Sequence, residues 1–266
     1  MTNEAMREFW AAQLNWVRLH DDSDAVLRAL DPWVLAPLRP GMRVLEIGCG
    51  AGGTTERIVE AVSPGGHVMA VDISAPFVEA ARERVPEAEF IVVDAQTDDL
   101  GSGFDACVSR LGTMFFEDTV AAFANIRRTL KPGAPIAFVA WAAPDENPHF
   151  GMPRRIASEV LGPLQISEPG APGPFGFADP DKPRAAAEAA GFGEVRVERV
   201  EATLSHPDGP DAYARLMMRI GPVVGAMRER EATADQRDLI ASRIREALIG
   251  MKGRVPAVLH AVTAIA

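Results

Sequence analysis

Between Pro40 and Trp141 the chain alternates short apolar runs, each bounded by glycine or an acidic residue, with longer stretches of helical apolar spacing. This alternation is typical of repeated βαβ units, in which a helix connects two parallel strands. We therefore expect an α/β core built on a mostly parallel sheet. The expected strands span 43–47, 67–71, 89–93, 106–109 and 135–140, and the expected helices between them lie near 53–62, 75–85 and 118–130.

The residues before this core predict helices. Apolar side chains recur at helical spacing over 9–38, with an interruption at the turn-prone run Asp21-Asp22-Ser23, so we expect two helices there. Residues 1–39 are taken as N-terminal helices or a lid, and 40–266 as the core with insertions. Trp10 and Trp16 either pack within these helices or belong to a lid over a bound cofactor.

The residues after the fifth expected strand are less regular. The segment after Trp141 is rich in proline and glycine, above all in the run 168–177. This composition excludes a regular helix or a central strand and predicts a cap or a long loop. The pattern then predicts a helix, a half-exposed strand, a helical stretch and a closing apolar run, at 180–190, 195–204, roughly 209–249 and 256–265. We expect the insertions at about 142–178 and 209–249 to act as a cap.

The net charge of the sequence limits the kinds of molecule that it is expected to bind. The 266 residues have a formal net charge of -10, which opposes the phosphate-neutralising surface that non-specific nucleic-acid binding needs. No run approaches the roughly 18 apolar residues of a membrane-spanning helix, and no leader-like segment opens the sequence. We therefore expect a cytoplasmic protein without membrane insertion, with Cys49 and Cys107 as reduced thiols. A small-molecule partner is favoured, and homodimer formation is left open.

One glycine-rich loop suggests a cofactor. A buried apolar strand is followed by Gly48, Gly50, Gly52 and Gly53, and then by the start of a helix. Glycine permits a tight turn and a close backbone approach to a ligand, while the helix start offers free N–H groups to a negative group. Asp72 follows at the end of the next strand, where an acid would bind a ribose. Because Gly48, Gly50 and Gly53 also satisfy the dinucleotide pattern, a nicotinamide cofactor stays an alternative.

Together with three later features, this loop resembles the class I S-adenosylmethionine-dependent methyltransferases, close to the ubiquinone-biosynthesis-like group, over about residues 40–200. In that family the loop has the pattern hydrophobic-Asp/Glu-hydrophobic-Gly-x-Gly-x-Gly, which matches Glu46, Gly48, Gly50 and Gly52. The resemblance implies a Rossmann-like, doubly wound sheet of seven strands with S-adenosyl-L-methionine as cofactor.

The other matches assign cofactor contacts by resemblance. The family places an acid at the end of the second strand on both ribose hydroxyls, which corresponds to Asp72, followed by Ile73. An Asp-Ala pair after the third strand lies beside the adenine in the family, which corresponds to Asp94 and Ala95. The fourth strand follows a Phe-Asp pair and ends beside the methionine part of the cofactor, which corresponds to Arg110.

The resemblance does not identify the methyl acceptor. Ligands of open α/β sheets bind beyond the carboxyl ends of the strands, so side chains that follow the fourth and fifth strands or lie in the cap are candidates for its pocket. These candidates are Met114, Phe115, Trp141, His149, Phe175 and Phe177. His149, near Asp145 and Glu146, is the candidate general base if the acceptor needs one. We expect a small, partly apolar acceptor, methylated by in-line displacement.

Two other functions stay open. An NAD(P)-dependent oxidoreductase would need a second mononucleotide-binding half and a Tyr-x-x-x-Lys pair or its equivalent, and the single tyrosine, Tyr213, lacks that lysine. A non-catalytic protein would bind S-adenosylmethionine without transferring its methyl group. A metal site is not expected, because the five histidines are far apart in the sequence.

Overall fold

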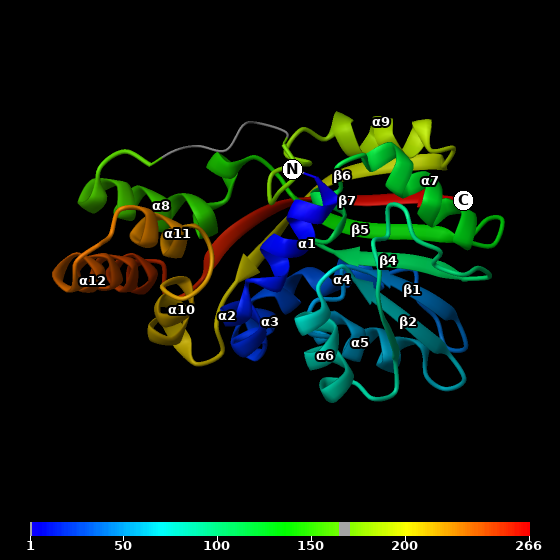
Figure 1. Ribbon diagram of the computed structural model, residues 1–266, viewed down its shortest axis with the longest axis horizontal. Coiled ribbons are helices and arrows are strands. Elements are labelled where there is room, and N and C mark those ends of the chain that lie inside the picture. The colour runs from blue at the N-terminus through cyan, green and yellow to red at the C-terminus, as the bar shows by residue number, and fades with distance from the viewer. Residues whose placement is uncertain (1, 165–170) are drawn as a thin grey trace.

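The computed structural model describes residues 2–164 and 171–266, and a seven-stranded sheet runs through it (Figure 1). The strands lie in the order β3-β2-β1-β4-β5-β7-β6. Their bounds are β1 Arg43–Ile47, β2 His67–Asp72, β3 Glu89–Val92, β4 Ala106–Arg110, β5 Pro135–Trp141, β6 Gly193–Leu204 and β7 Val255–Ile265. β1 to β5 pair in parallel, and β7 pairs antiparallel with β5 and β6. The expected Rossmann-like, mostly parallel seven-stranded sheet is confirmed.

Burial along the strands follows their place in the sheet. The central strands β1 and β4 are buried over nearly their whole length, as strands covered on both faces must be. β6 lies at an edge of the sheet, and most of its residues are exposed or partly buried. The mixture of apolar and charged residues that predicted a half-exposed strand over 195–204 therefore matches its position, although the strand begins earlier, at Gly193.

Helices cover both faces of the sheet, which makes the fold doubly wound (Figure 1). On one face α4 (Asp31–Leu35), α5 (Gly53–Val62) and α6 (Ala75–Arg84) pack against the parallel strands. On the other face α7 (Thr119–Thr129) packs against α9 (Asp181–Ala189), which also contacts β6 and β7. The bounds of α5, α6, α7 and α9 lie within one residue of those expected.

The N-terminal segment forms more helices than expected. They are α1 Asn3–Ala11, α2 Leu14–Arg18, α3 His20–Leu27, the 3-10 helix η1 Arg28–Leu30, and α4. The expected interruption at Asp21-Asp22-Ser23 is wrong, because these residues lie in the first turns of α3. The helix dipole favours acidic side chains there, so these acids mark a helix start. The α-helices break instead at Gln13 and at Leu19.

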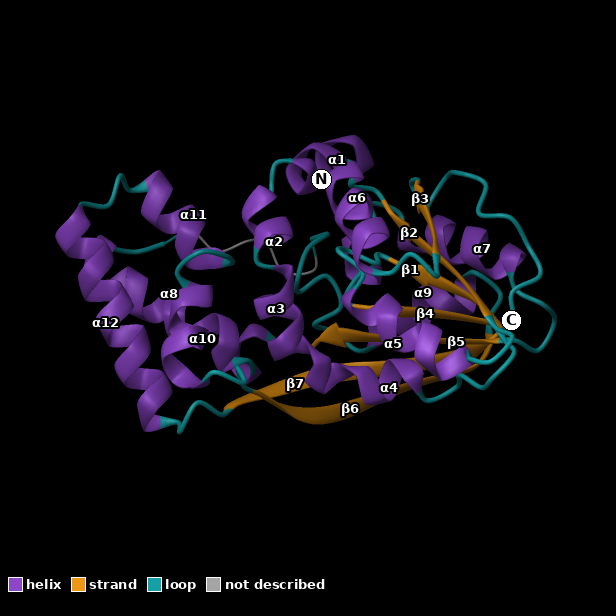
Figure 2. Cartoon of the chain, turned by 90° about the horizontal axis from the view of Figure 1, so that it is seen from below, coloured by secondary structure: helices purple, strands orange, loops and turns teal. Residues whose placement is uncertain are grey.

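Four helices gather at the end of the sheet where β5 and β6 end and β7 begins (Figure 2). They are α8 Pro148–Leu161, α10 Gly209–Met217, α11 Pro222–Glu229 and α12 Ala234–Gly250. α12 packs against α8 and α10, and α11 packs against α8. The two insertions expected from the sequence therefore pack together, and we call these four helices the cap helices.

Two expectations for this region need correction. The segment after Trp141 is not only a loop, because it contains α8, whose first turn accommodates Pro148 without losing a helical hydrogen bond. The stretch 209–249 is three helices rather than one. Gly221, at φ 82°, separates α10 from α11, and Thr233 caps the start of α12. Residues 168–170 of the proline-glycine run lie outside the described residues.

Candidate functional site

The loop between β1 and α5 has a backbone geometry that favours glycine. Gly48, Gly50 and Gly52 all have positive φ. At Gly48 a Cβ atom would lie only 2.8 Å from the Cα of Gly112, which follows β4. The loop therefore packs backbone to backbone against the end of β4, and a side chain at Gly48 would separate the two segments.

Asp72 ends β2 and bonds to this loop. One carboxylate oxygen accepts a hydrogen bond from the Gly50 amide at 2.9 Å, and the other accepts one from the Ser74 amide at 2.9 Å. Burial raises the pKa of Asp72, and hydrogen bonds from the backbone of Ser74, Gly50 and Ile73 partly offset that effect. The structure thus brings together the cofactor residues expected after β1 and β2.

Asp94 follows β3 and is held from two sides. Its carboxylate accepts hydrogen bonds from the Gln96 amide at 2.9 Å and from the Asn3 side chain of α1 at 2.7 Å. The neighbouring Ala95 carbonyl accepts a hydrogen bond from Asn125 of α7 at 2.9 Å. The first helix of the chain therefore reaches the edge of the sheet where the expected cofactor residues lie.

Trp10 holds α1 over the same edge. Its ring contacts Phe77 of α6 and Phe115 of the 3-10 helix η2 (Thr113–Phe115), at centroid distances of 6.0 and 5.3 Å, both edge to face. It also contacts Trp16 of α2 at 6.3 Å. These contacts join the N-terminal helices to the segments that follow β2 and β4. A lid role for them stays a proposal.

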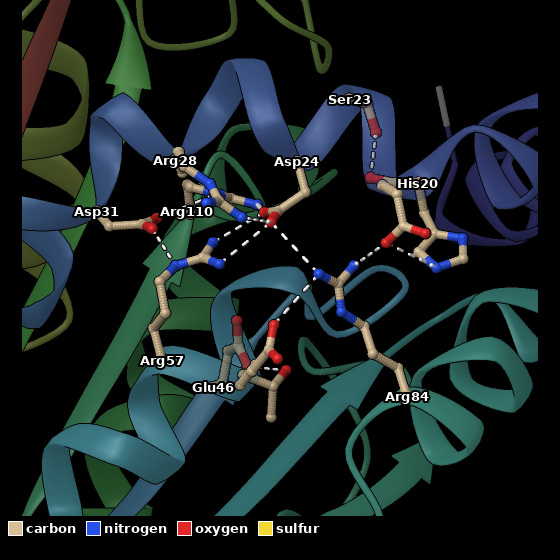
Figure 3. A network of polar contacts seen from close by, with 12 residues as sticks. His20, Ser23, Asp24, Arg28, Asp31, Glu46, Arg57, Arg84 and Arg110 are labelled. Atoms are coloured by element: carbon tan, nitrogen blue, oxygen red, sulfur yellow. Dashed lines mark hydrogen bonds and ion pairs between the residues drawn. The ribbon is translucent and has the colours of Figure 1, made fainter. Parts of the chain in front are cut away.

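A network of buried charges joins the N-terminal helices to the core (Figure 3). Arg110, at the end of β4, donates hydrogen bonds to Asp24 of α3 at 2.7 Å and to Asp31 of α4 at 2.9 Å. Arg57 of α5 bonds to the same two carboxylates, and Arg84 of α6 lies 3.5 Å from Asp24. Two acids from the N-terminal helices thus pair with three arginines from separate parts of the core.

This network changes the expectation for Arg110 and for the start of α5. The resemblance places Arg110 beside the cofactor, whereas in the structure its guanidinium bonds to Asp24 and Asp31. The Asp24 carboxylate also lies against Gly53, so closely that no Cβ would fit there. The chain's own acid therefore occupies the helix start at which the sequence suggested a ligand's negative group.

The pKa values of Asp24, in this network, and of Glu46, beside it, shift in opposite directions. Burial alone raises the pKa of Asp24, but hydrogen bonds and positive charge from Arg57 and Arg110 outweigh it and hold that pKa well below its ordinary value. Glu46 is buried in β1 and accepts a hydrogen bond from the Thr55 hydroxyl at 2.6 Å. Burial raises the pKa of Glu46 to about 7. At neutral pH Asp24 is therefore ionised, whereas Glu46 is partly protonated.

Three of the candidates for the acceptor pocket, on β5 and in the cap, lie in one aromatic cluster. Trp141 ends β5, and its ring stacks on His149 of α8 with centroids 5.9 Å apart and planes 14° apart. Phe150 contacts Trp141 at 5.1 Å and Phe175 at 5.0 Å. His149 Nδ1 lies 2.7 Å from the hydroxyl oxygen of Tyr213 in α10. The structure thus brings three candidates together and adds Phe150 and Tyr213, which sequence reasoning missed.

Phe177 and Met114 lie apart from this cluster. Phe177 is fully buried, and its ring contacts Phe123 of α7 and Phe138 of β5 at 6.2 and 6.1 Å. It belongs to the core between α7 and the sheet, so its expected place in the pocket is corrected. Met114 is also buried, and its carbonyl accepts a hydrogen bond from the Gly173 amide at 3.1 Å, which joins the cap segment to η2.

The acidic neighbours of His149 do not form a cluster with it. Glu146 pairs with Arg199 of β6 at 2.8 Å, and Asp145 is exposed. Burial lowers the pKa of His149 to about 4, and no charged group contributes to that shift. The imidazole is therefore neutral at pH 7.

The surface of the described chain has two hollows that are lined by other residues. One, of about 290 Å³, is lined by residues that include Ala25, Arg28 and Pro207. The other, of about 410 Å³, is lined by residues that include Asp98 and Arg128. Neither hollow is lined by the glycine loop or by the aromatic cluster.

Comparison with known proteins points to the same edge of the sheet as the candidate site. The family described as "Methyltransferase domain" matches residues 44–133, from β1 to the turn before β5. The chain contains a class I methyltransferase domain. Glu46, Asp72, Asp94 and Arg110 all lie within the matched residues of this methyltransferase domain. The resemblance to class I methyltransferases is confirmed, whereas the ubiquinone-biosynthesis-like group stays an expectation.

Curated relatives of the methyltransferase domain match over part of their length. Nocamycin O-methyltransferase of Saccharothrix syringae is 28% identical over 172 residues, which cover 59% of this chain and 61% of that protein. An uncharacterized methyltransferase of Mycobacterium bovis is 34% identical over 104 residues, which cover 38% of this chain and 51% of that protein. The chain thus spans less than two thirds of the length of these relatives.

Solved structures share the fold around the methyltransferase domain. Haemonchus contortus phosphoethanolamine N-methyltransferase 2, in complex with phosphomonomethylethanolamine and S-adenosylhomocysteine, matches with a TM-score of 0.51 at 18% identity, covering 89% of this chain and 52% of that chain. The [4+2]-cyclase SpnF matches with a TM-score of 0.51 at 16% identity, covering 87% and 79%. At these identities the likeness shows the fold alone, which a methyltransferase and a cyclase share.

In residues 2–164 and 171–266, no group of three or more His, Cys, Asp or Glu side chains could hold a metal ion. The same part of the chain contains no helix with the length and apolar character needed to cross a bilayer. Cys49 and Cys107 are buried free thiols, and burial raises the pKa of each. Cytoplasmic location and homodimer formation stay expectations.

Proposed function

We propose that this chain transfers the methyl group of S-adenosyl-L-methionine to a small, partly apolar organic acceptor. The proposal rests on one observation. The glycine loop after β1 and the acids after β2 and β3 lie at one edge of the sheet, within the span that matches a methyltransferase domain. Position, charge and backbone geometry therefore support the same cofactor.

The residues at this edge fit such a cofactor. The backbones of Gly48 and Gly112 approach each other closely, and a Cβ atom on Gly48 would fill the space between them. In the described chain the hydroxyls of Ser74 and Thr113 are buried without a hydrogen-bond partner. Because buried polar groups are normally paired, a bound molecule or an ordered water would complete their hydrogen bonds. Asp72 would hold the ribose, and Asp94 with Ala95 would lie beside the adenine.

When bound, the cofactor supplies a methyl group on a positively charged sulfur. The chain's own residues must hold the acceptor in line with that group and exclude water. Asp24, Asp31 and Trp10 hold the N-terminal helices against the segments that follow β2 and β4, which suits exclusion of water. The cap helices stand at the end of β5, which suits selection of the acceptor.

The acceptor side favours an organic molecule with apolar surface. Trp141, Phe150 and Phe175 place aromatic rings at the carboxyl end of β5, and pockets for organic ligands are lined mostly by such side chains. The name of the Saccharothrix syringae relative, nocamycin O-methyltransferase, supports an organic acceptor with an oxygen to be methylated.

Isothermal titration calorimetry tests the proposal. We expect binding of S-adenosylmethionine and of S-adenosylhomocysteine, and no binding of NAD at the same concentration. Binding of NAD alone would support the oxidoreductase alternative. Binding of S-adenosylmethionine without transfer of its labelled methyl group to a panel of phenols, enols and amines would support a non-catalytic protein.

A further inference from the structure

One polar pair lies inside the aromatic cluster at the end of β5. His149 Nδ1 and the Tyr213 hydroxyl oxygen are 2.7 Å apart. The His149 ring stacks on Trp141 and meets Phe150 edge to face, with centroids 4.8 Å apart in the second contact. A hydrogen-bonded pair in apolar surroundings is held in one geometry, because breaking it would leave buried polar groups unpaired.

The surroundings of Tyr213 fix the direction of this hydrogen bond. Its side chain is fully buried, and His149 is the hydroxyl's one hydrogen-bond partner within residues 2–164 and 171–266. A buried phenol O–H without an acceptor would cost free energy, so Tyr213 donates its proton to Nδ1 of His149. The other ring nitrogen, Nε2, then has a hydrogen whenever the imidazole is neutral.

The His149 imidazole is neutral at pH 7 and can donate a hydrogen bond. Burial lowers its pKa to about 4, and the groups that face the ring from β5, α8 and α10 are Trp141, Phe150 and Tyr213, none of them charged at neutral pH. His149 is partly exposed, and no side chain or backbone group of the described chain bonds to its Nε2. One N–H is therefore available to a bound molecule.

The topology places this N–H near the expected cofactor. Trp141 lies two residues beyond Val139, which pairs with Arg110 of β4. The loop after β4 contains Gly112, which contacts Gly48 of the glycine loop. Neighbouring strands are about 5 Å apart, so the His149 ring lies roughly two strands from the glycine loop along the same edge.

We propose that His149 donates Nε2–H to the reacting oxygen of an acidic hydroxyl, a phenol or an enol bound as its anion, and that Tyr213 is the positioning residue that sets this tautomer. The inference rests on the proposed function and names its acceptor class. A neutral imidazole donor in an apolar site stabilises an oxyanion by a charge-assisted hydrogen bond. The flat aromatic rings around His149 favour a planar conjugated acceptor.

This assignment differs from the base suggested by the sequence. With Nδ1 accepting from Tyr213 and Nε2 protonated, the ring has no free lone pair with which to remove a proton. The hydroxyl proton therefore leaves to solvent as the acceptor binds as its anion. During transfer the acceptor oxygen forms a bond to the methyl carbon while that carbon's bond to the sulfonium sulfur breaks. The electron pair of the broken bond stays on sulfur, S-adenosylhomocysteine leaves, and His149 stays neutral throughout.

The test uses the intact protein with 4-nitrophenol as probe and does not need turnover. Nitrogen-15 NMR of the histidine rings, assigned with His149→Gln, reports the tautomer. We expect Nε2–H in the wild type and a mixture of tautomers in Tyr213→Phe, which keeps the buried ring. Absorbance of 4-nitrophenolate reports ionisation of the probe, and we expect its ionisation constant to rise about tenfold on binding. Both variants should lose most of that rise, and His67→Gln, on the exposed start of β2, should keep it.

Three results would overturn the proposal. They are a wild-type His149 protonated at Nδ1, no binding of 4-nitrophenol at millimolar concentration, and an ionisation constant that rises equally in His149→Gln. The NMR measurement on the wild type needs no variant, so poor folding of a variant does not block the test. Calorimetric binding of S-adenosylmethionine to the same sample tests the proposed function separately. If the cofactor binds and the probe does not, only the acceptor assignment fails.

Discussion

The two halves of the proposed site are built from different chemistry. The cofactor half, at the ends of β1 to β4, consists of glycines, acids and arginines, and ion pairs of Asp24 and Asp31 join it to the N-terminal helices. The acceptor half, at the end of β5 and in the cap helices, consists of aromatic rings around the pair His149–Tyr213. The cofactor half depends on ion pairs and on the close approach of the Gly48 and Gly112 backbones. The acceptor half depends on aromatic packing and on the tautomer of His149. The two halves should therefore respond to different perturbations.

The largest expected effect is that of Asp24→Asn in the cofactor half. This change leaves Arg57, Arg84 and Arg110 short of one buried negative charge, and breaking a buried ion pair costs about 3–5 kcal/mol. We expect a loss of unfolding free energy of that size in urea titrations, together with weaker binding of S-adenosylmethionine.

The matched control is Asp21→Asn on the same helix. Asp21 also contacts Arg84, but its side chain is 79% exposed, and exposed pairs contribute less than about 1 kcal/mol. Equal stability losses in the two variants would mean that the buried network does not join α3 to the core as described.

Phe175 and Phe177 differ in burial, so their replacement by alanine should have different effects. Phe177→Ala should lower the free energy of unfolding by about 3–5 kcal/mol, because its ring is fully buried against Phe123 and Phe138. Phe175 is only partly buried, so Phe175→Ala should cost about 1 kcal/mol and weaken binding of 4-nitrophenol instead. Thermal unfolding and probe titration measure the two effects, and a larger stability loss for Phe175→Ala would reverse the assignment.

The pH dependence of stability should have opposite signs in the two halves. The pKa of Glu46 is about 7 in the folded chain against an ordinary 4.5, so the folded state binds more protons and stability falls as pH rises from 4.5 to 7. The pKa of His149 is about 4 against an ordinary 6.5, so stability rises as pH rises from 4 to 6.5. Each contribution is at most roughly 3 kcal/mol, and in the wild type they largely cancel.

Variants that remove Glu46 or His149 should reveal the contribution of the other residue to the pH dependence of stability. Glu46→Gln should leave a stability that increases from pH 4.5 to 6.5, and His149→Gln should leave one that decreases over the same range. Urea midpoints at four pH values across that range measure both slopes. Slopes that match the wild type in both variants would contradict the two pKa assignments.

A smaller effect on binding is expected for Asp72→Ala. Removal of the carboxylate that would accept from the ribose hydroxyls should weaken S-adenosylmethionine binding by about 1.5–3 kcal/mol, without loss of the fold. Asp105→Asn is the control, because Asp105 lies just before β4 and pairs with Lys131 at the opposite end of that strand. Unchanged calorimetric affinity in a folded Asp72→Ala would remove this residue from the site.

The fold and the cofactor half were largely predictable because their signals are local. Each parallel strand is a short apolar run bounded by glycine or an acid, and Asp72 follows β2 within the same βαβ unit as the glycine loop. Asp24 gave no such signal. It lies among other acids at the start of α3, and its partner Arg110 is 86 residues away in the sequence. Only the folded chain shows that this acid is buried and the neighbouring Asp21 exposed.

The acceptor half was less predictable, for two physical reasons. Proline at 148 and 153 hid the helix α8, so the geometry that points His149 toward Tyr213, 64 residues away, was not visible in the sequence. The ring of Phe177 enters the core from a proline-glycine segment, where sequence patterns give no direction to a side chain. The orientations of His149 and Phe177 both depend on packing against residues that are distant in the sequence.

Hydrogen exchange with and without saturating S-adenosylhomocysteine tests the central claim, that the cofactor binds in the half held by the N-terminal helices. We expect slower amide exchange in residues 47–56 and 72–74 and in α3, with α10, α11 and α12 unchanged. Protection confined to those three cap helices, or no protection at saturation, would mean that the cofactor does not bind in this half.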